Sequence, residues 1–180
     1  EKLKNIKSKV SCHYFINRNG LITQMVHDSK VAWHAGKSKW KNFQNLNENS
    51  IGIELVNKGH EFGYQNFSNK QISSLIKLCK KLKKKYTIKK QNFLAHSDIA
   101  PLRKKDPGEK FPWKRLSKYN LGLWYGSSNR KFKSTSPKNI KNSFFKNLYE
   151  IGYRYFKIDK RLKKDKLIIQ SFQKHFLPQN

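Results

Sequence analysis

The feature that most constrains the fold is a two-residue alternation over residues 50–56, SIGIELV. The two isoleucines and the leucine fall on one face of the strand that this pattern predicts, while Ser50, Gly52 and Glu54 fall on the other. A carboxylate on the small-residue face of an apolar strand is costly unless that face borders a cleft. Glu54 is therefore a candidate site residue.

An amphipathic helix is predicted directly after this strand. Ser68, with Gln71 three residues later, matches a capping box and predicts a helix that runs to about Tyr86. Its apolar residues recur at steps of three and four: Ile72, Leu75, Ile76, Cys79, Leu82 and Tyr86. Because Cys79 lies in this stripe, we interpret it as a packed core thiol.

Strands and helices interleave over the first 124 residues. Residues 10–26 predict a β-hairpin around a turn at 17–20, residues 28–49 a long aromatic-rich loop, and residues 93–95 a short strand ending at His96. The fold class is therefore α/β with mixed α+β character, a central mixed β-sheet flanked by helices in a domain over residues 1–124. Residues 125–140 predict a linker, and residues 141–180 a small all-α module that continues beyond Asn180.

The net positive charge narrows the classes of binding partner but does not identify one. The 180 residues contain 40 Lys and Arg against 11 Asp and Glu, a formal charge of +29. This charge favours a polyanionic partner or an anionic surface, and drift toward AT-rich codons is a third explanation. We expect no nucleic acid partner, because the basic residues are spread along the chain and no recognition helix or RNA-binding motif is visible. No apolar run is long enough for a membrane span, and no signal peptide is visible.

The few cysteines and carboxylates narrow the possible chemistry. Two cysteines exclude a disulfide-rich scaffold and a cysteine zinc cluster. Of the carboxylates, Glu54, Asp98 and Asp106 remain after those in loops and on solvated helix faces are set aside, and two of them share a segment with His96. His96 and Asp106 have a spacing that a His/Asp zinc site accepts. By spacing alone, however, a histidine that caps a loop and an aspartate that turns at Pro107 are the better explanation.

Four motifs in order carry a resemblance to a known family. They are Ser-x-His-Tyr-x-Ile at 11–16, Ala-Trp-His-Ala-Gly at 32–36, Asn-Ser-Ile-Gly-Ile-Glu at 49–54, and His-x-Asp-Ile-Ala-Pro-x-Arg-Lys-x-Asp-Pro-Gly at 96–108. Together they resemble the zinc-dependent N-acetylmuramoyl-L-alanine amidases of the type-2 amidase family, relatives of the peptidoglycan recognition proteins. The resemblance covers residues 8 to about 116.

The resemblance implies a Zn²⁺ cofactor and a role for each matched residue. It makes His96 and Asp106 zinc ligands and places the third ligand, a histidine, upstream of Glu1. We do not expect His13 or His34 to replace that ligand. Glu54 matches the general base and Lys104 the residue that stabilises the oxyanion.

For several of these residues other roles stay open. A salt bridge is the alternative for Glu54, and a solvated charge is the alternative for Lys104. Asp98 is interpreted as a residue that fixes the geometry of a ligand or orders the loop, rather than as a ligand itself. The substrate-binding residues are expected to be His34, Trp33 and Trp40, with packing as the alternative for the tryptophans.

The tail resembles a helical peptidoglycan-binding module, on Leu-Tyr-x-Ile-Gly-Tyr at 148–153 and Ser-Phe-Gln-Lys-His-Phe-x-Pro at 171–178. Amidases with such a module are mostly periplasmic, so we expect a periplasmic or secreted protein that degrades the cell wall, with a cytoplasmic enzyme as the alternative. The expected reaction is hydrolysis of the amide between N-acetylmuramic acid and L-alanine in peptidoglycan or muropeptides. The alternative is a non-catalytic peptidoglycan-binding protein that has lost a zinc ligand.

Overall fold

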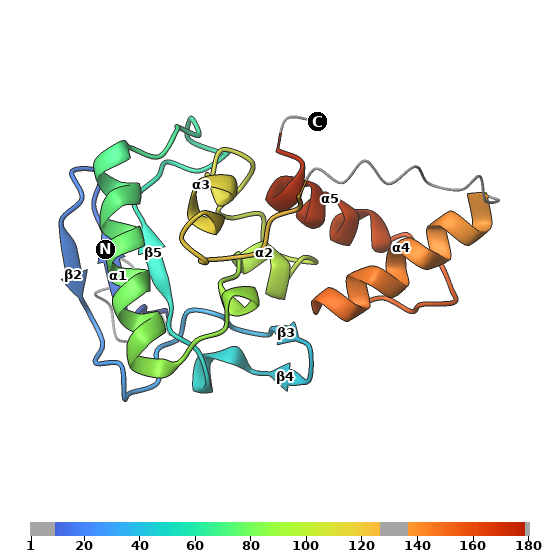
Figure 1. Cartoon of the computed structure of the whole chain (residues 1–180), viewed down its shortest axis with the longest axis horizontal. Helices are drawn as coiled ribbons and strands as arrows, with labels where there is room; N and C mark the ends of the chain where they lie inside the picture. The colour runs from blue at the N-terminus through green and yellow to red at the C-terminus, as the bar shows by residue number, and fades with distance from the viewer. Residues whose placement is uncertain (1–9, 127–136, 179–180) are drawn as a thin grey trace.

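The computed structural model describes residues 10–126 and 137–178, and its centre is a three-stranded sheet (Figure 1). Strands β1 (Tyr14–Ile16) and β2 (Ile22–Gln24) form the predicted antiparallel hairpin. Strand β5 (Ile53–Leu55) pairs with β1 in parallel, so that Glu54 lies opposite Phe15. The order β2-β1-β5 therefore makes the sheet mixed, as expected.

Helix α1 (Asn69–Tyr86) packs against this sheet. The Ser68 hydroxyl accepts a hydrogen bond from the Gln71 backbone N–H, as the capping signal predicts. The Gln71 amide does not return to Ser68, however. It donates to the carbonyls of Ile16 and Val56 at 3.0 and 3.1 Å, and so ties the helix to the ends of two strands.

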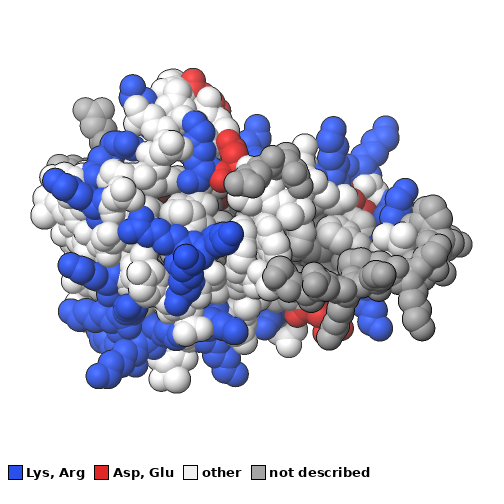
Figure 2. Space-filling model, turned by 45° about the horizontal axis from the view of Figure 1, so that its top comes forward, with Lys and Arg blue, Asp and Glu red and all other residues white. Residues whose placement is uncertain are grey.

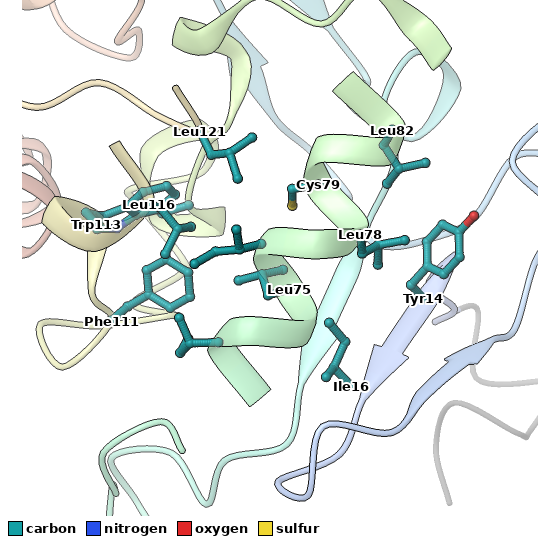
Figure 3. Packing of buried hydrophobic residues seen from close by; sticks show 13 residues of the cluster. Tyr14, Ile16, Leu75, Leu78, Cys79, Leu82, Phe111, Trp113, Leu116 and Leu121 are labelled. Carbon is teal, nitrogen blue, oxygen red and sulfur yellow. The ribbon is translucent and has the colours of Figure 1, made fainter. Parts of the chain in front are cut away.

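One hydrophobic core lies on both sides of α1, as Figure 3 shows. Tyr14 and Ile16 of β1 flank the helix on one side, and the segment from Phe111 to Leu121 flanks it on the other. Cys79 is 4% exposed within this core, so its interpretation as a packed thiol is confirmed.

Two segments differ from the expected pattern. Residues 28–49 are not one continuous loop, because they contain a small hairpin of β3 (Lys39–Trp40) and β4 (Phe43–Gln44) and the 3₁₀ helix η3 (Leu46–Glu48). The strand expected at residues 93–95 is wrong: this extended piece joins the 3₁₀ helix η4 (Lys90–Asn92) to the short helix α2 (His96–Ile99). Helix α3 (Trp113–Ser117) follows.

The described chain ends in two helices, α4 (Pro137–Ile151) and α5 (Asp165–Phe176), and we call these helices, together with the loop of residues 152–164 between them, the C-terminal helical pair. Most of the expected linker, residues 127–136, lies outside the described residues. The helical pair shares a second hydrophobic core with the first part of the chain: Trp40 and Leu46 pack with Phe145, Leu148, Tyr153, Ile168 and Phe176. At the end of α4, a Cβ on Gly152 would lie 2.5 Å from the Trp40 ring, so only glycine allows this close approach.

Basic side chains cover much of the surface. Figure 2 shows Lys and Arg spread over the visible face with few Asp or Glu among them. Among the described helices, none has both the length and the apolar character needed to cross a bilayer.

Candidate metal and amidase site

His96 and Asp106 meet at the rim of the fold. His96 is the first residue of α2, and Asp106 lies in the loop after it. The Ser97 N–H donates to the Asp106 carbonyl at 3.0 Å and holds the loop against the helix. The His96 Nδ1 atom lies 3.1 Å from the Asp106 Oδ2 atom, with the two side chains 15% and 53% exposed. The structure therefore brings together the two residues that are 10 positions apart in sequence.

The surroundings of His96 fit a bound cation. Its Nδ1 faces Asp106, and its Nε2 lies 3.2 Å from the Ala35 carbonyl oxygen, so both ring nitrogens face acceptors. A neutral imidazole has one N–H and can satisfy only one of them. Two ligands of a tetrahedral zinc, with bonds of about 2.0–2.2 Å, lie about 3.3–3.6 Å apart, a few tenths of an ångström more than the 3.1 Å observed here.

The ligand set is incomplete within the part of the chain that the structure describes. Residues 10–126 and 137–178 contain no group of three or more His, Cys, Asp or Glu side chains placed to hold a metal ion. A catalytic zinc needs three protein ligands and an open position. His96 and Asp106 therefore fit two of the three ligands.

Glu54 faces the same place from β5. Burial raises the pKa of Glu54, and the negative charge of Asp106 raises it further, while His96 and Lys104 act in the opposite direction. For Asp106, burial alone would raise the pKa, but the hydrogen bond and charge of His96, together with Lys104, lower it. These electrostatic interactions show that the four predicted residues, His96, Asp106, Glu54 and Lys104, lie near one another.

His34 lies beside this site and is closely packed. A Cβ on Gly52 would lie 2.2 Å from the His34 Cγ atom, so the small residue of the alternating strand makes room for the ring. The pKa of His34 falls to about 4, mainly through burial and also through the neighbouring His13 and His96. His34 is therefore neutral at pH 7.

His13 is not available as a ligand. It is 1% exposed; its Nδ1 accepts from the Gly52 N–H at 3.1 Å, and its Nε2 lies 3.0 Å from the Lys30 carbonyl. The acceptor role of Nδ1 puts the proton on Nε2, so both nitrogens are occupied. His13 has a structural role just before β1, where its ring joins Gly52 to Lys30.

The two tryptophans expected to bind substrate have different environments. Trp33 is 56% exposed and accessible to a ligand. Trp40 is 3% exposed and packs edge-on against Tyr153, with ring centroids 5.2 Å apart. The expectation that Trp40 lines a groove is therefore wrong, because the C-terminal helical pair covers its ring.

The sequence motifs do not reveal that His175 pairs with Asp98. The His175 Nδ1 atom lies 2.7 Å from the Asp98 Oδ2 atom, with side chains 4% and 0% exposed. The partners are 77 positions apart, and no local pattern links them. The sequence offers one indication, that Asp98 and His175 each fall within a motif that resembles a known family, at residues 96–108 and 171–178.

The family model described as N-acetylmuramoyl-L-alanine amidase, Amidase_2, matches residues 1–109. The N-acetylmuramoyl-L-alanine amidase AmiD of Escherichia coli is 36% identical over 185 residues, which cover 94% of this chain and 67% of AmiD. The 1,6-anhydro-N-acetylmuramyl-L-alanine amidase AmpD of Haemophilus influenzae is 42% identical over 108 residues. That match covers 59% of this chain and 56% of AmpD.

Solved structures agree with these matches. AmiD in complex with the substrate anhydro-N-acetylmuramic acid-L-Ala-D-γ-Glu-L-Lys has a TM-score of 0.84 at 34% identity, over 99% of this chain and 74% of that one. AmpDH3 of Pseudomonas aeruginosa in complex with anhydromuramic pentapeptide has a TM-score of 0.77 at 29% identity, over 94% of this chain and 74% of that one. Both the fold class and the amidase function expected from the sequence are confirmed. The chain belongs to the Amidase_2 family of N-acetylmuramoyl-L-alanine amidases.

Proposed function

We propose that the chain uses zinc to hydrolyse the amide bond between N-acetylmuramic acid and L-alanine in muropeptides. The observation that supports this most directly is the 3.1 Å contact between His96 Nδ1 and Asp106 Oδ2, with Glu54 and Lys104 electrostatically coupled to it. We propose His96 and Asp106 as two zinc ligands and a histidine before Glu1 as the third. A bound zinc would polarise the scissile carbonyl and make an attacking water more acidic.

The remaining steps fall to side chains of this chain. Glu54 takes the proton from the attacking water and passes it to the departing L-alanine nitrogen. The raised pKa of its carboxyl group suits a residue that must hold this proton between the two steps. Lys104 presents a positive charge to the oxygen that becomes negative when the carbonyl is attacked. His34 and the exposed Trp33 contact the substrate beside these groups.

We also propose that residues 1–124 form the catalytic part and residues 141–180 a peptidoglycan-binding part after a linker. The match to AmiD supports this division, because the AmiD structure matches 99% of the chain, whereas the match to AmpD covers 59% of it. Peptidoglycan peptides carry free carboxylates, to which the basic surface is attracted. We propose a periplasmic or secreted location on this basis.

A Glu54→Gln variant tests the mechanism. The substitution keeps the shape of the side chain but removes the base, so we expect release of the L-alanine-headed peptide to fall by about 10²–10⁴-fold. Zinc content should stay the same, because Glu54 is not a proposed ligand. Chromatography of products from 1,6-anhydro-muropeptides and from intact peptidoglycan measures the loss and identifies the preferred substrate. Unchanged turnover in the variant would remove Glu54 from the mechanism.

A non-catalytic peptidoglycan-binding protein is the second candidate. It is favoured by one observation, that the described residues supply only two of the three ligands. Zinc-loaded full-length protein that binds muropeptides without cleaving them would support this candidate. Cleavage that stops on addition of EDTA and returns with zinc would exclude it.

A further inference from the structure

We propose that Tyr153 and His175, from the C-terminal helical pair, are positioning residues that hold the zinc ligand His96 in place through Asp98. The inference rests on the proposed function, in which His96 binds zinc. It gives the C-terminal helical pair a second role, because the pair then completes the support of the catalytic site.

Asp98 is a fully buried carboxylate surrounded by donors. Its Oδ1 atom accepts from the Tyr153 hydroxyl at 2.5 Å, and its Oδ2 atom accepts from the Ala95 N–H at 2.8 Å and from His175 Nδ1 at 2.7 Å. A buried carboxylate without such partners would cost several kcal/mol. Two of the three donors come from the C-terminal helical pair, so Asp98 depends on that pair for its place.

The orientation of His175 is fixed from several sides. Because a carboxylate only accepts, the ring nitrogen that faces Asp98 carries the proton. The ring stacks on Trp113 with centroids 4.0 Å apart and on Phe176 with centroids 4.2 Å apart. The imidazole is thus packed between a residue of the catalytic part and a residue of α5, with its donor aimed at Asp98.

Helix α2 connects Asp98 to the metal site. This helix has only four residues, and Asp98 caps it by accepting the N–H of Ala95, the residue before His96. Residues two apart on a helix point in different directions, so the buried side chain of Asp98 anchors the inner side while His96 reaches Asp106 at the rim. A shift of Asp98 would therefore turn or loosen the helix that carries His96.

Two tyrosines offer a matched test. Tyr153→Phe removes the hydroxyl that donates to Asp98, whereas Tyr155→Phe removes a buried hydroxyl that has no hydrogen-bond partner among the described residues. For Tyr153→Phe we expect about a 10-fold weaker affinity for zinc, measured by chelator competition on the full-length protein. We expect kcat to fall at unchanged KM, because the substrate contacts stay intact. Tyr155→Phe should match the wild type in both measurements.

His175 provides a rescue experiment. His175→Asn keeps an N–H donor near the position of Nδ1, whereas His175→Leu has none. We expect His175→Leu to weaken zinc binding and to change the visible spectrum of the Co²⁺-substituted protein, and His175→Asn to restore both in part. Thermal unfolding of each variant identifies any that fail to fold. If His175→Leu fails to fold, Tyr153→Phe, which loses a single oxygen, still tests the inference through its zinc affinity.

The outcomes separate the inference from the proposed function. Folded Tyr153→Phe and His175→Leu variants with wild-type zinc affinity and Co²⁺ spectrum would overturn the inference, even if their melting temperatures fall. A wild-type protein that binds zinc but cleaves no muropeptide would overturn the proposed function and leave the zinc measurements as a valid test of positioning. A wild-type protein that binds no zinc would overturn both.

Discussion

Two histidine–carboxylate pairs of the same chemical type stand on either side of helix α2. The pair of His96 and Asp106 lies at the rim, with an exposed carboxylate and a 3.1 Å separation. The pair of Asp98 and His175 is buried, 2.7 Å apart, and two further donors satisfy its carboxylate. The comparison teaches that residue type alone does not decide the role. The exposed carboxylate of the first pair suits its proposed role in binding zinc, whereas the three donors around the buried Asp98 carboxylate suit a structural support.

Replacing Asp98 or Asp106 by asparagine should give the largest difference between the two pairs, one in stability and the other in activity. Asp98→Asn puts an N–H₂ group among three donors, so we expect the free energy of unfolding to fall by about 3 kcal/mol. Asp106 is exposed, so Asp106→Asn should change the free energy of unfolding by about 0.5 kcal/mol or less. Amide hydrolysis should nevertheless be lost in Asp106→Asn, because a proposed ligand is gone. Urea denaturation and product chromatography measure the two effects, and equal stability losses would contradict the comparison.

The positive charge of Lys104, near His96 and Asp106, allows a test of the proposed oxyanion stabilisation. Lys104 is among the main electrostatic influences on both Glu54 and Asp106, whereas its neighbour Lys105 is not. We expect Lys104→Met to lower kcat by about 10²–10³-fold, as removal of one oxyanion-stabilising group does. Lys105→Met is the matched control and should keep kcat within about twofold. Similar losses in both variants would show that general positive charge, and not one placed lysine, supports the reaction.

Asp28 extends the comparison to a third carboxylate. Burial alone would raise its pKa, but hydrogen bonds from Tyr14, Lys85 and Tyr86 lower it to about 2. A lowered pKa in the folded state stabilises the fold above the unfolded value near 4, and this contribution is lost as the pH falls toward 2. At pH 7 we expect Asp28→Asn to be less stable by about 1 kcal/mol.

The pH dependence distinguishes this effect from general acid denaturation. Urea denaturation at pH 7, 4 and 2.5 should show the difference between wild type and Asp28→Asn shrinking as the pH falls. Glu61→Gln, at an exposed loop position, serves as the control and should follow the wild type throughout. A constant difference across the three pH values would mean that shape, and not charge, explains the loss.

Features that depend on local pattern could be predicted from the sequence. The capping serine, the apolar stripe of α1 and the alternation around Glu54 each lie within one element. The structure agrees with the cap, with the stripe apart from the exposed Tyr86, and with the packing of Ile51, Ile53 and Leu55 on the core. The strand expected at 93–95 failed because three apolar residues do not specify a strand without a neighbour to pair with. Trp40 could not be assigned to the core, because the helices that bury it come about a hundred residues later.

The same limit applies to the site. His96 and Asp106 share one segment, and their motif identified them before any geometry was known. The environment of Asp98 depends on Tyr153 and His175, which are 55 and 77 positions away in sequence. Only folding brings these residues together, so the surroundings of Asp98 were less predictable than the proposed ligands His96 and Asp106.

The close fit of Gly152 against Trp40 means that the two parts of the chain cannot readily be separated. Because the indole ring is covered by the end of α4, a chain cut after residue 126 would expose an apolar patch and leave Asp98 with one of its three donors. The C-terminal helical pair would equally lose its partner surface if it were transplanted to another enzyme. The two parts should therefore melt in a single transition and be inherited together.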